Sequence, residues 1–396
     1  MAVLGMRGSG SWSADERPKN YREAILYLYP NDKAPLMGFL SKLASEATDD
    51  PEFKVFIKGL PQQRAKVEDI YNNTDNPVTI HLKTADDYKM FKIGHVVINE
   101  RTLEVMWVTN VVSTGGAGGA LTCTRGLGTP VAQSLTAGAV DDYILVVGTR
   151  HSEGAGIPEA IAYDPSVISN FTQIFRNSLN QSNIARATHL RTGDQVKNAQ
   201  KETMLLHHIE MEKAFLFGVA HEAAGTNGNA ERGTRGMLFH ISTLVKDFSA
   251  GLDIDTWENF LEDLFRYGSN QKLMLAGGRA INVMNKLARI NGHIELVPKT
   301  ETFGMAIWSY LCPFGELMLK IHPLMSENST FNSWGFVFDT GQLRYRYLKG
   351  RDTQYLRNRQ TPGDDAVKDE YLTEAGLEGR FEQTHALIKN MTSAVV

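Results

Sequence analysis

Hydrophobic and polar residues alternate most clearly in the last fifth of the chain, over residues 339–391. Leu343, Tyr345 and Tyr347 alternate with Arg344 and Arg346, which is the two-residue period of a half-buried β-strand. After a turn at 362–363 the chain becomes acidic, with carboxylates at Asp364, Asp365, Asp369, Glu370, Glu374, Glu378 and Glu382. Opposite charge on two such segments favours pairing within one subunit or between neighbouring copies. We therefore expect a surface for assembly rather than for catalysis.

Apolar residues at helical spacing predict one long helix over residues 194–217. Thr192 or Asp194 is the expected N-cap, and Gly218 marks the expected end. The apolar face of this helix is interrupted by polar residues. About 24 residues at about 1.5 Å each predict a rod about 36 Å long. The pattern over 165–180 also indicates moderate helical character.

Short β-branched runs separated by turn residues dominate the region from about 67 to 149. They predict five strands, at 78–82, 95–99, 104–113, 121–124 and 143–147. Strands at this spacing are typical of a small twisted β-barrel or an elaborated hairpin.

The N-terminal region and the region from residue 255 onward differ in their pattern of apolar residues. Recurrent prolines before residue 62 predict an extended arm with short helical pieces at 22–29 and 35–43, which must bury their apolar faces elsewhere. From residue 255 onward, helices are expected at 255–265, capped by Asp255, and at 278–288. Strands are expected at 272–276, 293–297, 304–310, 316–322 and 334–339. Such mixing without a β-α-β cadence predicts an α+β fold.

Composition narrows the class of protein. A chain of 396 residues with 42% hydrophobic and 22% charged residues is an ordinary globular protein with room for two or three compact units. A formal net charge of -4 argues against nucleic-acid binding by net electrostatics. Cys123 and Cys312 lack the spacing of a zinc site or a disulfide framework. No apolar run approaches a signal peptide or membrane helix, so we expect a cytoplasmic origin and no membrane partner.

Candidate catalytic chemistry is sparse. His208 and Glu212 are spaced i,i+4 on the long helix beside His207, but the HExxH pattern is absent and no further ligand is evident. No GxSxG elbow occurs, and the paired aspartates stand beside turn formers, where aspartate bonds the backbone. We expect no enzyme activity, no metal and no cofactor.

Three groups of segments resemble the major head proteins of tailed bacteriophages. They are 17–26, 35–36 with 40–43, and 49–53 near the start, 91–94, 124–129 and 153–155 in the β-rich region, and 347–353, 371–374 and 376–378 near the end. The resemblance covers nearly the whole chain in the right order. It implies the Hong Kong 97-type capsid fold, with an N-terminal arm (1–60), an E-loop region with a small β-barrel-like elaboration (61–152), a peripheral domain with a spine helix (153–250, helix 194–217), an axial domain (251–324) and a return to the peripheral domain (325–396).

The function implied by this resemblance is a major capsid protein. Its copies would form the hexamers and pentamers of an icosahedral head that encloses double-stranded DNA, in a virion assembled in the host bacterial cytoplasm. The arm motif starts by Trp12, so a separate scaffolding protein is expected rather than a fused one, together with a portal and an optional decoration protein. The alternatives are an encapsulin-like nanocompartment shell of the same fold and, further away, a metal-dependent hydrolase that uses His208 and Glu212.

Most of the candidate contacts between subunits are charged residues. Arg357 and Arg359, beside the turn at 362–363, are expected to meet acidic groups of neighbouring copies where capsomers join. The full set of candidates is Arg344, Arg346, Arg351, Arg357, Arg359, Asp364, Asp365, Trp12 and Arg17. The resemblance also raises covalent cross-linking between an E-loop lysine (Lys83, Lys89 or Lys92) and Asn358, but that match is one of residue type alone.

Overall fold

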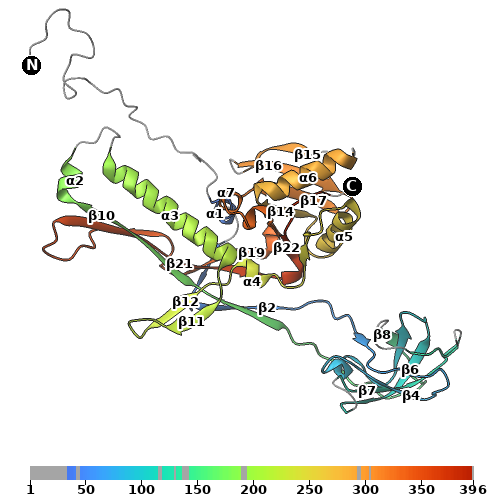
Figure 1. Ribbon diagram of the computed structural model, residues 1–396. Helices are drawn as coiled ribbons and strands as arrows, with labels where there is room; N and C mark the ends of the chain where they lie inside the picture. Colours follow the sequence, from blue (N-terminus) through green and yellow to red (C-terminus); the bar gives the residue numbers. More distant parts are fainter. Residues whose placement is uncertain are drawn as a thin grey trace, which may run out of the picture. The chain divides into compact units, whose positions relative to one another are not determined.

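The computed structural model describes residues 34–41, 45–114, 118–128, 131–135, 142–188, 194–291, 296–302 and 305–394. The chain forms two compact units (Figure 1). The inserted unit comprises residues 56–166, and the main unit comprises the chain up to residue 55 and from residue 167. Helices and strands are interspersed along the main unit, so the predicted α+β class is confirmed.

The inserted unit is a closed antiparallel barrel. Its sheet runs in the order β3 (Arg64–Lys66), β8 (Tyr143–Thr149), β5 (His95–Asn99), β6 (Val105–Val112), β7 (Ala120–Thr124) and β4 (Val78–His81). An antiparallel bridge between Val67 and Leu82 joins the two outer strands, which removes the free edges of the sheet. The five predicted strands are all present. The sixth, β3, escaped prediction because it is three residues long and mostly polar.

A fully buried ion pair holds one wall of this barrel. Arg125 donates from Nε and Nη2 to the Glu104 carboxylate at 2.9 and 2.7 Å, and both side chains are inaccessible to solvent. The remaining bonding capacity is also used, since Arg125 donates to the carbonyl oxygens of Asn72 and Gln133, and Gln133 N donates to Glu104. A buried charge is tolerated only when it is fully hydrogen-bonded. The bonds that satisfy this pair also attach the segments around residues 72 and 133 to the barrel.

The first sheet of the main unit carries the charged C-terminal strands. Its order is β1 (Ser45–Thr48), β19 (Leu343–Leu348), β21 (Ala366–Gly379) and β10 (Gln173–Ser182), and β20 (Gln354–Leu356) also pairs with β21. The β1–β19 pair is parallel and the others are antiparallel. Leu343, Tyr345 and Tyr347 face the core, so the predicted strand and its inward face are confirmed.

The long helix predicted over 194–217 is α3 (Gln195–Phe217). The Asp194 carboxylate caps it by accepting from Val196 N at 3.0 Å and Lys197 N at 3.3 Å. All the buried residues of α3 lie in its second half, from His207 to Leu216. The side chains of the first half are exposed or partly exposed.

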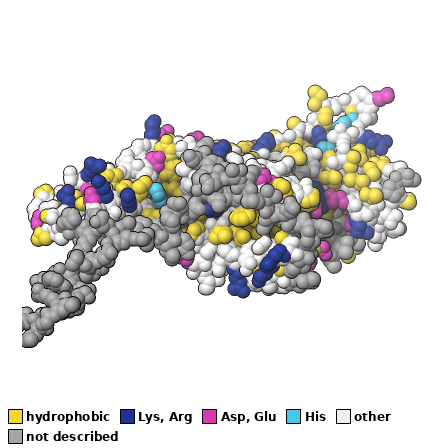
Figure 2. All heavy atoms as spheres, turned by 90° about the horizontal axis from the view of Figure 1, so that it is seen from above, with side chains coloured by type: hydrophobic (Ala, Val, Ile, Leu, Met, Phe, Trp, Pro, Cys, Tyr) yellow, Lys and Arg dark blue, Asp and Glu magenta, His cyan; other side chains and the backbone are white. Residues whose placement is uncertain are grey.

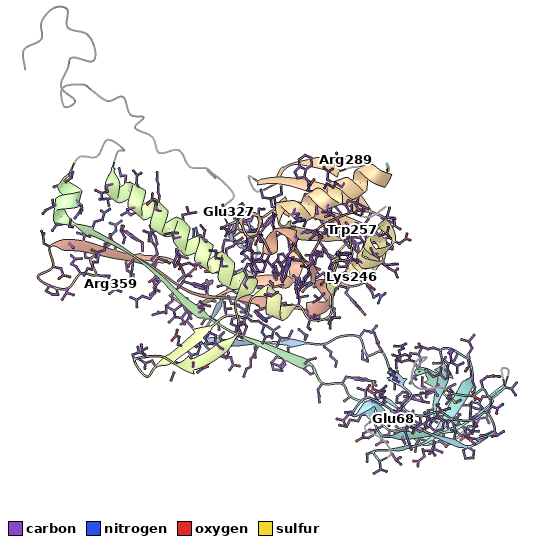
Figure 3. All side chains as sticks on the ribbon, in the orientation of Figure 1. Glu68, Lys246, Trp257, Arg289, Glu327 and Arg359 are labelled. Atoms are coloured by element: carbon purple, nitrogen blue, oxygen red, sulfur yellow. The ribbon has the colours of Figure 1, made fainter. Side chains whose placement is uncertain are left out.

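The second sheet of the main unit has seven strands and a separate core. Its order is β13 (Val245–Asp247), β22 (Ala386–Lys389), β18 (Gly335–Phe338), β14 (Gln271–Ala276), β17 (Gly315–Ile321), β16 (Met305–Cys312) and β15 (Leu296–Thr302). Helices α5 (Ile254–Phe265) and α6 (Gly278–Asn291) contribute buried side chains to this core, among them Trp257, which is labelled in Figure 3. Of the expected strand 293–297, residues 293–295 lie outside the described part of the chain.

The N-cap of α5 differs from the prediction. Asp253 is the cap, because its carboxylate accepts from Asp255 N at 3.3 Å, and Asp255 lies inside the first turn. Asp253→Ala is expected to lower the free energy of unfolding by about 1 kcal/mol, since it leaves a helix donor unbonded. Asp255→Ala removes only a favourable charge near the helix N-terminus and should cost about half as much or less. Urea unfolding of both variants tests this, and a larger loss for Asp255→Ala would contradict it.

The segment 165–180 is not helical as predicted. It forms β9 (Ser166–Phe171) and the first part of β10. In β10 the buried residues are Phe175 and Leu179, four positions apart, and that spacing fits one face of a strand as well as one face of a helix. This segment is a strand because it pairs with β21, from Gln173 opposite Ala375 to Ser182 opposite Ala366.

Shorter elements complete the fold. The helical piece expected at 35–43 is α1 (Pro35–Leu40), whereas the piece expected at 22–29 lies outside the described residues. The strand β2 (Glu52–Ile57) pairs with β9, and β11 (His221–Ala224) pairs with β12 (Ala230–Gly233). The others are α2 (Asn183–Ala187), α4 (Met237–His240), α7 (Pro323–Glu327) and the 3-10 turns η1 (Asp87–Met90), η2 (Phe331–Ser333), η3 (Thr340–Gln342) and η4 (Glu382–Thr384).

Candidate assembly surface

The basic and acidic C-terminal segments pair with each other inside one subunit. In the antiparallel register of β19 and β21, Arg344 lies opposite Glu378 and Arg346 lies opposite Gly376. The hairpin strand β20 extends the same sheet along the first part of β21. Part of the charge pattern is therefore satisfied within the chain, as one of the two sequence-based alternatives expected.

Several glutamates of β21 are buried and neutralised by arginines. The Arg346 guanidinium is 2.8 Å from Glu46 and also pairs with Glu378, whose side chain is 2% exposed. Arg351 Nε lies 2.6 Å from Glu374 Oε2. Because Arg346 and Arg351 hold partners in their own sheet, their first role is to allow these carboxylates to be buried. Arg344 donates from Nη1 to the carbonyl oxygen of Leu343 at 3.0 Å.

The loop between β20 and β21 carries the other predicted contacts, and Figure 3 labels Arg359 there. Arg359 Nε is 3.6 Å from Glu370 Oε1, with the arginine 56% exposed. Arg357 lies 5.3 Å from the centre of the Tyr355 ring, a cation–π distance. Of the remaining predicted contacts, Trp12 and Arg17 lie outside the described residues.

The two aspartates of this loop are exposed. Asp364 accepts a hydrogen bond from Lys368 Nζ at 2.9 Å, which lowers the pKa of Asp364 and keeps it ionised. Asp365 accepts from Asn183 Nδ2 at 2.5 Å. Both contacts lie at the surface, where such interactions contribute little to stability and leave the carboxylates free to exchange partners.

Glu212 is committed to structure rather than to a metal. Its Oε1 accepts from Leu36 N and from His322 Nε2, both at 2.8 Å, and its Oε2 accepts from Met37 N at 2.7 Å. The carboxylate thus binds the first turn of α1, where helix N–H groups lack partners, and attaches this segment to α3. Over the described ranges, no cluster of three or more His, Cys, Asp or Glu side chains could hold a metal ion.

Two histidines are buried and neutral. His207 lies between Asn177 and Thr373, whose oxygens are 2.6 and 2.7 Å from its ring nitrogens, and burial lowers its pKa to about 4. His385 Nδ1 accepts from Asp339 N at 3.3 Å, and burial lowers its pKa to about 3. Both rings are inaccessible to solvent, so neither can reach a substrate.

A buried lysine lies near His385. Lys272 Nζ donates to the carbonyl oxygens of Tyr267 at 2.9 Å and Thr384 at 2.6 Å, and burial lowers its pKa to about 8. This ammonium group joins β14 to the turn that precedes β22. Both of its hydrogen bonds therefore stabilise the fold.

The lysine and asparagine candidates for cross-linking belong to different units of the chain. Lys89 forms a surface ion pair with Asp86 at 2.9 Å in the inserted unit. Asn358, in the main unit, has a positive φ of 57° and donates from its backbone N to Asp369 at 2.9 Å. Cross-linking between an E-loop lysine and Asn358 stays a hypothesis.

Sequence reasoning missed several charged partners. Arg176 pairs with Glu370 at 2.5 Å, but it lies in the segment that was predicted to be helical. Glu46 lies on β1, a four-residue strand with no apolar alternation to reveal it. Arg380 pairs with Glu378 directly beyond β21, where two positions along an extended chain place both side chains on one face.

The surface shows a mixed charge distribution. In Figure 2, basic and acidic side chains are interspersed on the face shown, without a broad field of one sign.

Among the helices in the described ranges, none has the length and apolar character needed to cross a membrane.

Comparisons with known proteins agree with this picture. A sequence model for the family described as SU10 major capsid protein matches residues 7–392. The major capsid protein of Pseudomonas phage PaMx41 is 25% identical over 360 residues, covering 88% of this chain and 82% of that protein.

Solved structures were also compared. The capsid of a native GTA particle has a TM-score of 0.48 at 9% identity, covering 99% of this chain and all of the other. A Mycobacterium phage Bobi chain has a TM-score of 0.47 at 8% identity, covering 97% and 99% of the two chains. The holo-SrpI encapsulin of Synechococcus elongatus has a TM-score of 0.42 at 10% identity, covering 59% and 80%. Because the family match spans nearly the whole sequence, the chain belongs to the SU10 major capsid protein family.

Proposed function

We propose that copies of this chain assemble into the hexamers and pentamers of an icosahedral phage head that encloses double-stranded DNA. The observation that carries the proposal is the match to a major capsid protein family over residues 7–392. The protein acts as a structural subunit and not as an enzyme, with no cofactor. The virion is assembled in the host cytoplasm, with a portal, a separate scaffolding protein and an optional decoration protein as partners.

The proposed arrangement is the Hong Kong 97-type fold. Its parts are the arm (1–60), the E-loop region (61–152), the peripheral domain with its spine helix (153–250), the axial domain (251–324) and the returning C-terminal strands (325–396). The long capped helix α3 and the closed barrel of the inserted unit support this division.

Exposed apolar residues also favour a subunit that is completed by assembly. In the inserted unit, Leu60 is 90% exposed and Ile157 is fully exposed, and both lie outside the helices and strands. Apolar side chains so exposed on extended segments are typical of surfaces that a partner covers. A shell subunit supplies that partner as a second copy.

Size separates a shell from a small oligomer. The purified protein is expected to elute in the void volume of a size-exclusion column and to show closed particles in negative-stain microscopy. Elution at the volume of a 44.0 kDa monomer or a small oligomer would contradict the proposal. Nuclease-protected DNA in the particles identifies a phage head, whereas packaged cargo protein would identify the nanocompartment alternative, which has less support because the sequence matches are to phage proteins.

A further inference from the structure

A polar pocket lies where the β20–β21 hairpin meets α2 and the start of α3. Its volume is about 330 Å³, and its lining includes Arg186, Arg357, Tyr355, Asn358, Gln200 and Asp369. The lining comes from two stretches of chain, β10 to α3 and β20 to β21, and its residues Gln200 and Tyr355 are 155 positions apart, so the pocket is formed by tertiary structure. Arg186 was not singled out from the sequence.

Hydrogen bonds order the floor of this pocket. Gln200 Nε2 donates to the Tyr355 hydroxyl at 2.7 Å, and that hydroxyl donates to Asp369 Oδ2. Asp369 Oδ1 accepts from Asn358 N at 2.9 Å, which holds Asn358 in its left-handed conformation. Asp369 is 8% exposed and both its oxygens are bonded. The one carboxylate of the lining is therefore already occupied.

Two guanidinium groups form the exposed rim. Arg186 and Arg357 are both exposed, and neither forms an ion pair with a carboxylate in the part of the chain that the structure describes. Arg359, directly after the pocket residue Asn358, differs because Glu370 pairs with it. The pocket thus has two available fork-shaped cations, which bind carboxylates and phosphates with good geometry.

We propose that this pocket receives the carboxylate of Asp364 from a second copy of the chain. The inference rests on the proposed function, because it requires neighbouring copies. Asp364 is exposed in the turn six residues after Asn358, so that the acidic group and the pocket occupy the same end of one hairpin. Because the Asp364 carboxylate and the pocket lie at the same end of the subunit, copies can join head to tail in a small closed ring. Each copy then donates one carboxylate and receives one.

A protein carboxylate fits the surroundings better than a nucleic-acid backbone does. Asp369 lines the pocket and Asp365 accepts from Asn183 on α2, so a phosphodiester chain entering here would lie near carboxylates. Nucleic-acid binding also needs cations that extend along a track, whereas the neighbouring Arg359 is engaged by Glu370. A single carboxylate in a fixed register requires only the two arginines that are present.

Assembly across a concentration series tests the pocket. Arg357→Gln, Arg186→Gln and Asp364→Asn are each expected to raise the protein concentration at which half the subunits sediment as particles by about tenfold or more. The charge swap Arg357→Glu with Asp364→Arg should assemble better than either single substitution, because it rebuilds the Arg357–Asp364 pair in reverse although Arg186 stays positive. Lys197→Gln is the matched control, since it removes an exposed positive charge near the start of α3 without touching the pocket. Circular dichroism and thermal melting establish that each variant is folded.

Three outcomes would overturn the inference or its basis. If the wild-type chain forms particles and the three variants assemble equally well, the pocket has no role in assembly while the proposed function stands. If the variants form normal shells that retain less DNA, the pocket binds phosphate rather than a carboxylate. If the wild-type chain forms no particles, the proposed function itself fails.

Discussion

Replacing Glu212 with alanine is expected to lower the free energy of unfolding of the main unit by about 3–5 kcal/mol, because it leaves several buried polar groups without a partner. The Glu212 carboxylate is inaccessible to solvent and accepts from the backbone of Leu36 and Met37 and from His322. Alanine would leave two helix N–H groups and the Nε2–H of His322 unbonded, and each such buried group costs about 1–3 kcal/mol. Chemical denaturation of the dissociated subunit measures the loss.

The same substitution should release α1 from α3. Hydrogen exchange at the amides of Leu36 and Met37 is expected to become faster, since their acceptors are gone. The matched control is Glu210→Ala, on the same helix, where an exposed carboxylate accepts a single hydrogen bond from Asn177 at 2.9 Å. That control should cost no more than about 1 kcal/mol. Equal losses for the two variants would show that the attachment of α1 does not depend on Glu212.

The role of Glu212 shows what local sequence patterns cannot reveal. Its partners Leu36 and His322 are 176 and 110 residues away, so no helical or strand period connects them. From the sequence, His208 and Glu212 were considered as metal ligands because i,i+4 spacing places them on one helix turn. In the structure the carboxylate bonds the backbone of α1 instead. Spacing on one helix identified neighbours, but long-range packing decided their chemistry.

Elements with strong local signals were predicted well. The capped helix α3, the barrel strands and the Leu343–Leu348 strand each follow from a period and a cap or turn that lie within the element. The β10 strand was wrong because its buried residues are four positions apart, which both periods allow. Its identity comes from pairing with β21, almost two hundred residues later.

The charged tail illustrates the same division. Alternation predicted where the arginines and glutamates lie, and the register shows which of them meet. Arg346 and Arg351 hold buried glutamates within the chain. Arg357 has no such partner among the described residues, and it remains the arginine of this set best placed to act between copies. The domain boundaries inferred from the family resemblance stay predictions.

Acid is expected to destabilise the subunit below about pH 6.5, because His207 and His385 are buried as neutral rings. Burial lowers their pKa values from 6.5 to about 4 and about 3. In this range the unfolded chain binds protons that the folded chain refuses, so the free energy of unfolding falls as the pH falls. Each histidine contributes about 1.4 kcal/mol per pH unit between about pH 6 and its folded pKa. Burial shifts the pKa values of His208 and His240 in the same direction and adds to the slope.

Variants isolate the contribution of each buried ring. His207→Asn and His385→Asn should each reduce the slope of unfolding free energy against pH between 6 and 4.5 by about 1.4 kcal/mol per pH unit, whatever they cost in stability at neutral pH. The slope is the informative quantity, because lost packing shifts the whole curve while a lost titration flattens it. His221→Asn, on the exposed strand β11, is the matched control, because it makes the same replacement outside the core. Working below pH 7 keeps Lys272 fully charged, since its pKa is about 8. If the slopes of the two buried-histidine variants match that of the wild type, these histidines already accept protons in the folded subunit, and the acid response comes from other groups.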